Sequence, residues 1–319
     1  MSDMRYVRAR PGRAGVALVA LAIAWTVLPL QAQHTHGHGA VAGTEMPPEL
    51  AAEIEAVRRA TERYVDHANA IADGYTRFGS DGQLMGGHWF HPDLVQKPLD
   101  LERPSTLQYA NIDGRMTLVG VAYTVYRSPG EPLPEGFSGS DDVWHVHDVK
   151  QMAGTLTSDR PLLRFLVDRR MRRQTGDRNE RTLLTMLHAW VWLDNPAGLF
   201  AQHHLALPYL RAGLLIPENA TLAASSGVSL LAPDACRMEL RRVGFIARLS
   251  DSQHAILREA CSAAANDVRA ARNASDAIDP AAEAAWRRYE RIQASVLTRE
   301  QEQRLESMIE HPGGMIQGR

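Results

Sequence analysis

The sequence predicts an α+β fold in which a long N-terminal helix and a small, mainly antiparallel β-sheet domain are followed by an all-α helical hairpin module. Three observations lead to this expectation. Apolar residues recur at three- and four-residue steps between residues 49 and 71, which is the period of an amphipathic helix. Glycine-punctuated runs rich in Val, Tyr, Trp and Leu fill residues 79–210. Beyond residue 236 the chain is rich in Ala, Arg and Glu and has a helical texture.

The first 32 residues have the pattern of a secretory signal peptide. Four arginines precede an apolar run over residues 14–30, and the small residue Ala32 follows that run. The run is short for a membrane span and residues 31–38 are polar, so cleavage is favoured over a retained anchor. We therefore expect an exported, periplasmic protein with no membrane span after signal cleavage.

Composition narrows the function classes. Of 319 residues, 45% are hydrophobic and 23% are charged, which suits a globular protein. The chain has 35 Lys and Arg against 37 Asp and Glu, so its formal net charge is −2. A general nucleic-acid binder usually has a strongly basic balance, so no nucleic-acid partner is expected.

Residues 33–48 form a His-rich segment that we expect to be a flexible linker. It contains His34, His36 and His38, which alternate with small or polar residues that cannot pack a core. Such a tract can bind Cu, Ni or Zn without a folded scaffold.

An α+β domain is predicted over residues 49–211. Its N-terminal helix begins after Pro47 and Pro48. A β-hairpin is expected from strands at 106–110 and 116–126, because the turn-forming tetrapeptide 111–114 separates them. Two further strands are expected at 143–149 and 183–193, with a helix between them that begins near Asp159.

Residues 212–235, which contain Pro, Ser and Gly, are predicted to be a linker, and residues 236–311 a helical module. Within the module, Leu249-Ser-Asp-Ser-Gln253 and Leu297-Thr-Arg-Glu-Gln301 repeat one short motif. In each copy a hydroxyl residue lies three positions before a Gln, which is the spacing of a capping box. The two motifs therefore predict two helix starts.

The chain contains only two cysteines, Cys236 and Cys261. In an exported protein an even pair favours a disulfide, and a two-Cys metal site is the alternative. If a turn near Arg248 and Leu249 joins two antiparallel helices, the two thiols are equally far from that turn. They would then be level across the hairpin, as a disulfide requires.

The doubled Leu-Ser/Thr-x-x-Gln motif resembles the LTxxQ family of periplasmic proteins, the CpxP and Spy-like envelope-stress and metal-response factors, over residues 236–308. This resemblance implies a bent all-α hairpin without enzymatic activity, acting as a stress sensor or as an ATP-independent chaperone. It also implies misfolded or envelope proteins as partners of the helical module.

Histidines and tryptophans gather between residues 88 and 204, which contain seven of the 13 His and four of the six Trp. His145 and His147 lie two apart, so a strand would place both on one face, where one divalent ion could bind them. His188, from a neighbouring strand, would complete a three-His site, and His88 could add a fourth ligand from a loop. Such imidazole-rich sites suit Zn, Cu or Ni. The alternative is that these histidines only form structural hydrogen bonds, which we favour for His91, His203 and His204.

The middle of the chain resembles a family of uncharacterised secreted bacterial proteins. The resemblance spans residues 60–200 and rests on these segments: Ala60-Thr61 with Tyr64, residues 72–75, Met85-Gly-Gly-His88, residues 103–109, residues 118–123, Leu187-His-Ala-Trp190 and Asn195-Pro-Ala-Gly-Leu-Phe200. It supports one domain with defined His positions and implies no particular reaction.

Together these features predict an exported bacterial metal-binding or metal- and envelope-stress protein that is not a catalyst. Two alternatives stay open: a metal-dependent enzyme that uses the three-His site, and an LTxxQ-type chaperone whose histidines are incidental. The sequence contains no Gly-x-Ser-x-Gly motif, Walker loop or His-Glu-x-x-His motif, so no catalytic residue is assigned.

Overall fold

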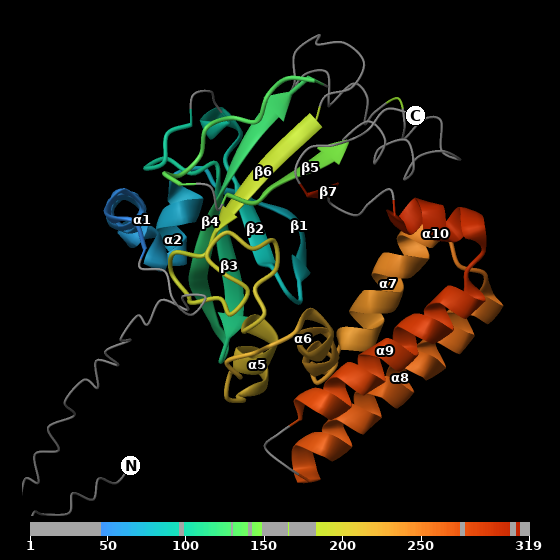
Figure 1. Ribbon diagram of the computed structural model, residues 1–319. Helices are drawn as coiled ribbons and strands as arrows, with labels where there is room; N and C mark the ends of the chain where they lie inside the picture. The colour runs from blue at the N-terminus through green and yellow to red at the C-terminus, as the bar shows by residue number, and fades with distance from the viewer. Residues whose placement is uncertain are drawn as a thin grey trace, which may run out of the picture. The chain divides into compact units, whose positions relative to one another are not determined.

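The computed structural model describes residues 46–95, 99–128, 130–139, 142–148, 165, 183–274, 278–306 and 311–312 (Figure 1). All of these belong to one compact unit, residues 37–319. The predicted signal peptide, the tract with His34, His36 and His38, and the start of the helix expected near Asp159 lie outside the described residues.

An antiparallel sheet confirms the α+β prediction; most of its strands come from the first part of the chain, and the short strand β7, at the end of the segment 236–311 predicted to be helical, pairs with β5. Its spatial order is β1-β2-β3-β4-β6-β5-β7. The strands are β1 (Thr76–Gly82), β2 (Gly86–Phe90), β3 (Thr106–Ile112), β4 (Arg115–Arg127), β5 (Trp144–Asp148), β6 (Leu183–Ala189) and β7 (His311–Pro312). A short 3-10 helix, η2 (Pro92–Leu94), follows β2.

The predicted hairpin and the two predicted strands are present. β3 and β4 are joined by Asp113 and Gly114, both with positive φ, which is the backbone that a tight two-residue hairpin turn requires. β5 pairs with β6, so His145 and His188 come from neighbouring strands as expected. His88, by contrast, was expected in a loop and lies in strand β2. The two glycines before it are untypical of a strand and made a loop the expected structure. Glycine is needed at position 86 because its φ is positive and a side chain there would collide with the Tyr109 carbonyl.

The N-terminal helix is interrupted. Instead of one helix over residues 49–71, the chain forms α1 (Pro48–Thr61), a 3-10 turn η1 (Glu62–Val65) and α2 (His67–Ala72). Thr61 ends α1, and its hydroxyl bonds back to the Val57 carbonyl while accepting from Trp192. Asp66 then caps α2 by accepting from the Ala68 amide. The apolar period continues through this break, which is why it predicted one helix.

The two faces of the sheet differ. Leu50, Ile54 and Val57 of α1 form the main core with residues that point to one face, among them Leu107, Val121, Tyr123, Trp144 and Leu187. We call the opposite face the histidine face, because strand alternation places His88, Gln108, Gly120, Met186, His188 and His145 on it. Residues 118–125 of β4 are buried on both faces.

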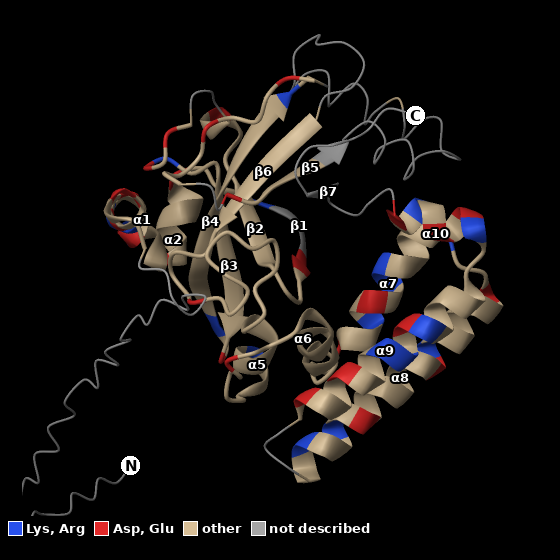
Figure 2. Cartoon of the chain, in the orientation of Figure 1, with Lys and Arg blue, Asp and Glu red and all other residues tan. Residues whose placement is uncertain are grey.

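The second part of the chain is helical. It contains α5 (Leu207–Ala212), α6 (Leu222–Ser229), α7 (Ala235–Ala247), α8 (Asp251–Ala274), α9 (Asp279–Val296) and α10 (Arg299–Glu306). Charged residues recur along α7–α10, whereas β4 and β6 carry few (Figure 2). Within the part of the chain that the structure describes, no helix is both long enough and apolar enough to span a membrane.

The segment 212–235, predicted to be a linker, contains the buried helix α6 instead. Its residues 223–229 are all buried, and it packs against α9. The contact is close because the side chains are small: a Cβ on Gly227 would lie 2.1 Å from the Ala282 carbonyl oxygen. Pro, Ser and Gly suggested a linker in the sequence, but within α6 the small residues allow two helices to approach closely.

The two Leu-Ser/Thr-x-x-Gln motifs meet in space and start α8 and α10. In each, the backbone amide of the Gln donates to the hydroxyl oxygen, and the backbone amide of the Ser or Thr donates to the Gln Oε1. These two bonds form a reciprocal capping box, Ser250 with Gln253 and Thr298 with Gln301. The two Gln side chains also bond to each other, with Nε2 to Oε1 distances of 2.8 and 3.0 Å. Each Nε2 donates further to a backbone carbonyl, that of Val296 or of Arg248. We call this arrangement the glutamine junction.

Cys236 in α7 and Cys261 in α8 are joined by a disulfide bond, with their Cα atoms 5.7 Å apart. This is the pair expected from the sequence. Arg248, which has a left-handed backbone, ends α7, and α8 begins at Asp251, so the bond links two consecutive helices of a hairpin.

Candidate metal site on the histidine face

Strand register brings the candidate ligands to one region of the histidine face. His88 in β2 is level with Gln108 in β3, and Gln108 is level with Gly120 in β4. His188 and Met186 lie two apart in β6, and Met186 is level with His145 in β5. Five strands and the alternation of each therefore determine where these side chains point.

The sheet must curve toward the histidine face. His88 and His188 belong to strands separated by two others, β3 and β4. In a flat sheet three strand spacings would separate them by about 14 Å, too far for two imidazoles to meet. Their Nε2 atoms are nevertheless 3.4 Å apart. The histidine face is thus the concave side of the sheet.

Gly120 leaves room inside this curve. A Cβ at that position would lie 2.9 Å from both Trp190 Cε3 and the Ala189 carbonyl oxygen, and 3.2 Å from Gln108 Oε1. A β-bulge beside it, where the register shifts between Gln108 and Tyr109, adds local twist. Glycine at this place leaves space for the side chains of Gln108 in β3 and of Trp190, the residue after β6, to lie against β4.

The imidazole of His188 has a defined proton arrangement. Its Nδ1 lies 3.0 Å from the Gln202 carbonyl oxygen, which can only accept, so Nδ1 carries the proton and donates. In the neutral ring Nε2 then holds a lone pair. That atom lies 3.4 Å from His88 Nε2 and 3.3 Å from Met186 Sδ. His188 is 1% exposed and His88 is half-buried.

The loop after β6 positions that carbonyl. Asn195 organises residues 195–205: its Nδ2 donates to the carbonyls of Gly198 and His203, and its Oδ1 accepts from the amides of Ala197 and Leu205. Trp190 Nε1 also donates to the Ala201 carbonyl. The segment Asn195–Phe200, noted in the sequence, therefore supports the Gln202 carbonyl and, through it, the orientation of His188.

His145 lies against His188, with ring centroids 4.8 Å apart, and is fully buried. His147 lies two residues after His145 in β5. Among the described residues, no group of three or more His, Cys, Asp or Glu side chains is placed to bind one metal ion. His88 Nε2 and Met186 Sδ each lie close to His188 Nε2, at 3.4 and 3.3 Å.

Other histidines have structural contacts. Burial lowers the pKa of His204 to about 4, and its Nε2 donates to the Leu193 carbonyl. Burial also lowers the pKa of His67, whose ring packs edge-on against Trp89. His91 Nε2 donates to the Asp73 carbonyl. For His91 and His204 these bonds agree with the structural interpretation of the sequence.

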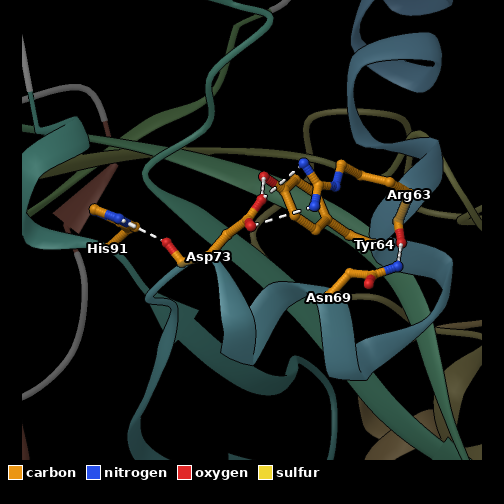
Figure 3. Close-up of polar contacts among 5 residues, drawn as sticks. All are labelled: Arg63, Tyr64, Asn69, Asp73 and His91. Carbon is orange, nitrogen blue, oxygen red and sulfur yellow. Dashed lines mark hydrogen bonds and ion pairs between the residues drawn. The ribbon is translucent and has the colours of Figure 1, made fainter.

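Asp73 is the centre of a polar network that fixes the helices after α1 (Figure 3). Its carboxylate accepts from Arg63 and from the Tyr64 hydroxyl, and its backbone carbonyl accepts from His91. Asn69 Nδ2 donates to the Arg63 carbonyl. Through these bonds the network ties η1 and α2 to the end of β2.

A row of polar side chains on the histidine face was missed at the sequence level. Thr106, Gln108 and Thr124 are at most 1% exposed. Within the described part of the chain, neither amide atom of Gln108 has a hydrogen-bond partner, nor does Thr106 Oγ1 or Thr124 Oγ1. Buried polar atoms are usually bonded, so these are exceptions with a cost of about 1–3 kcal/mol each. Their common position beside His88 and His188 could be recognised only once the register was known.

Comparisons with family models, with curated proteins and with solved structures find no match to this chain.

Proposed function

We propose that the chain is an exported metal-binding protein of the bacterial envelope, whose folded site uses His88 and His188 with His145 beside them. The observation that carries this proposal is the 3.4 Å distance between the Nε2 atoms of His88 and His188. Two imidazoles that bind one ion at 2.0–2.1 Å with a tetrahedral angle have nitrogens about 3.3–3.4 Å apart.

The surroundings of His188 also favour a ligand role. Metal-binding histidines commonly donate the other ring N–H to a carbonyl or carboxylate, which fixes the tautomer and the ring orientation. The Nδ1 of His188 makes such a bond to Gln202. The neighbouring unpartnered atoms of Gln108, Thr106 and Thr124 are suited to an occupant of the site, such as water bound to the ion.

The helical module has a separate role in this proposal. We propose that it is an LTxxQ-type module that contacts envelope proteins and contributes no ligand to the metal site. Its glutamine junction uses its polar groups internally, and its disulfide suits an oxidising compartment. Val243 and Leu257 are buried within the module.

Metal binding should be measured by dialysis and elemental analysis on the full chain with His34, His36 and His38 replaced by Ser, which removes the competing tract. We expect roughly one Zn(II) or copper ion per chain. His88→Gln should abolish this binding, whereas the matched control His254→Gln, in α8, should keep it. If the chain with these three histidines replaced binds no ion, or if its His88→Gln variant binds the ion as well as the control does, the proposed function is wrong.

A further inference from the structure

We infer that the site on the histidine face is a copper(I) site in which Met186 Sδ is a ligand together with the Nε2 atoms of His88 and His188. This inference rests on the proposed function, because it names the metal and the third ligand of the same site. It adds a residue that the sequence did not mark as a ligand.

The position of Met186 is the first support. It lies two residues before His188 in β6, on the same face, and is 8% exposed. Its sulfur is 3.3 Å from His188 Nε2, while His88 Nε2 is 3.4 Å from that same nitrogen. With bonds of about 2.05 Å to nitrogen and 2.3 Å to sulfur, these separations correspond to angles of about 110° at the ion for N–N and about 100° for N–S. Both values are close to tetrahedral.

The donor chemistry is the second support. A thioether is a soft, neutral ligand that selects Cu(I) over harder ions, whereas Zn(II) in proteins is bound by thiolate, imidazole and carboxylate. One sulfur and two imidazole nitrogens therefore match Cu(I) better than Zn(II).

Burial is the third support. All three donors are uncharged, so they leave the full charge of the ion in a site where His188 is 1% and Met186 is 8% exposed. The cost of moving an ion from water into a low-dielectric interior grows with the square of its charge. For this reason the neutral, buried set favours a monovalent ion over a divalent one.

The test uses the full chain with His34, His36 and His38 replaced by Ser, kept anaerobic and titrated with Cu(I) against a chromogenic Cu(I) chelator. Met186→Leu, a swap that nearly conserves volume, should lower the Cu(I) affinity at least tenfold. Residues that only hydrogen-bond to metal ligands typically change metal affinity 10- to 100-fold when they are replaced, so loss of a ligand should cost no less. It should change the Zn(II) affinity by less than about twofold, because zinc would not use the thioether. The matched control is Met116→Leu in β4, which should leave both affinities unchanged.

X-ray absorption on the Cu(I)-loaded chain without the Met186 substitution gives a readout that does not depend on folding of a variant. We expect a sulfur scatterer at about 2.3 Å beside nitrogen scatterers at about 2.0 Å. Copper bound with nitrogen scatterers alone, or equal Cu(I) affinity in Met186→Leu, would overturn the inference while leaving the proposed function intact. If the chain binds neither Cu(I) nor Zn(II), the proposed function fails with it.

Discussion

The glutamine side chains of two regions in this molecule differ in whether their amide groups are hydrogen-bonded. At the glutamine junction, Gln253 and Gln301 bond to each other and to the two helix starts, so that both amide hydrogens and the carbonyl oxygen of each are in use. Gln108 on the histidine face is fully buried, yet within the described residues neither of its amide atoms has a partner. The first arrangement stabilises a fold, and the second costs stability.

This difference separates structural polar residues from candidate functional ones. A buried group that is fully bonded needs no other explanation than folding. A buried group without partners, placed beside imidazoles whose nitrogens point at one another, is better explained by something that binds there. The comparison can therefore be tested by substitutions that should act on one region and leave the other unchanged.

The largest effect should come from the helical side. Replacing both Cys236 and Cys261 by Ala removes a cross-link between residues 25 apart in the chain. The free energy of unfolding should fall by on the order of 3 kcal/mol, since the unfolded chain gains freedom. Urea unfolding under non-reducing conditions measures this change, and an equal metal affinity in the double variant would show that the disulfide acts on the helices alone. A loss below about 1 kcal/mol would contradict the account.

Gln253→Met should have the next largest effect. It removes a capping-box bond, a bond to the Val296 carbonyl and both bonds to Gln301, and it leaves the Gln301 amide with only its bonds to Arg248 and Thr298. We expect about 2–3 kcal/mol of destabilisation in urea unfolding. Gln303→Met, at an exposed position in α10, is the control and should change stability by less than about 0.5 kcal/mol. Equal effects in the two variants would show that the junction contributes nothing specific.

The sheet side should carry a pH dependence through His204. Its folded-state pKa of about 4 lies below the unfolded value of 6.5, so its stabilising contribution is present above pH 6.5 and is lost as the pH falls toward 4. The chain should be roughly 2 kcal/mol less stable at pH 5 than at pH 7 from this group. Comparing urea unfolding at the two pH values for the native chain and for His204→Gln isolates the contribution. An unchanged pH difference in the variant would contradict it.

The smallest effect is expected for Gln108→Met, the counterpart of Gln253→Met. Because the amide of Gln108 has no partner among the described residues, removing it should leave stability unchanged or raise it by up to about 1 kcal/mol. The same apolar substitution would thus destabilise one region and not the other. If Gln108→Met destabilises the chain as much as Gln253→Met, the distinction between the two regions is wrong.

Local chemistry explains what the sequence could predict. The two helix starts, the hairpin turn at Asp113-Gly114 and the Cys236–Cys261 pair depend on neighbouring residues or on simple spacing. The break between α1 and α2 and the helix α6 could not be predicted, because they depend on tertiary contacts of Thr61 and Gly227 with distant residues.

The candidate site shows the same limit. Alternation correctly predicted that His145 and His188 lie on neighbouring strands, but only the curvature of the sheet brings His88 to His188. The positions of Met186 and Gln108 also required the register. An apolar Met in a strand looks like a core residue, and an isolated Gln carries no signal in a sequence.

The most direct test of the account measures which nitrogen of the His188 ring is protonated and which nitrogen binds the metal. The method is long-range proton–nitrogen correlation NMR on the chain with His34, His36 and His38 replaced by Ser, before and after one equivalent of Zn(II) or Cu(I) is added. His188→Gln assigns the signals. We predict Nδ1 protonated and Nε2 bare in His188 before metal, followed by large shifts of Nε2 in His88 and His188 with those of His91 and His204 unchanged. Metal-induced shifts confined to other histidines, with His88 and His188 unmoved, would contradict the central claim that this pair binds the ion.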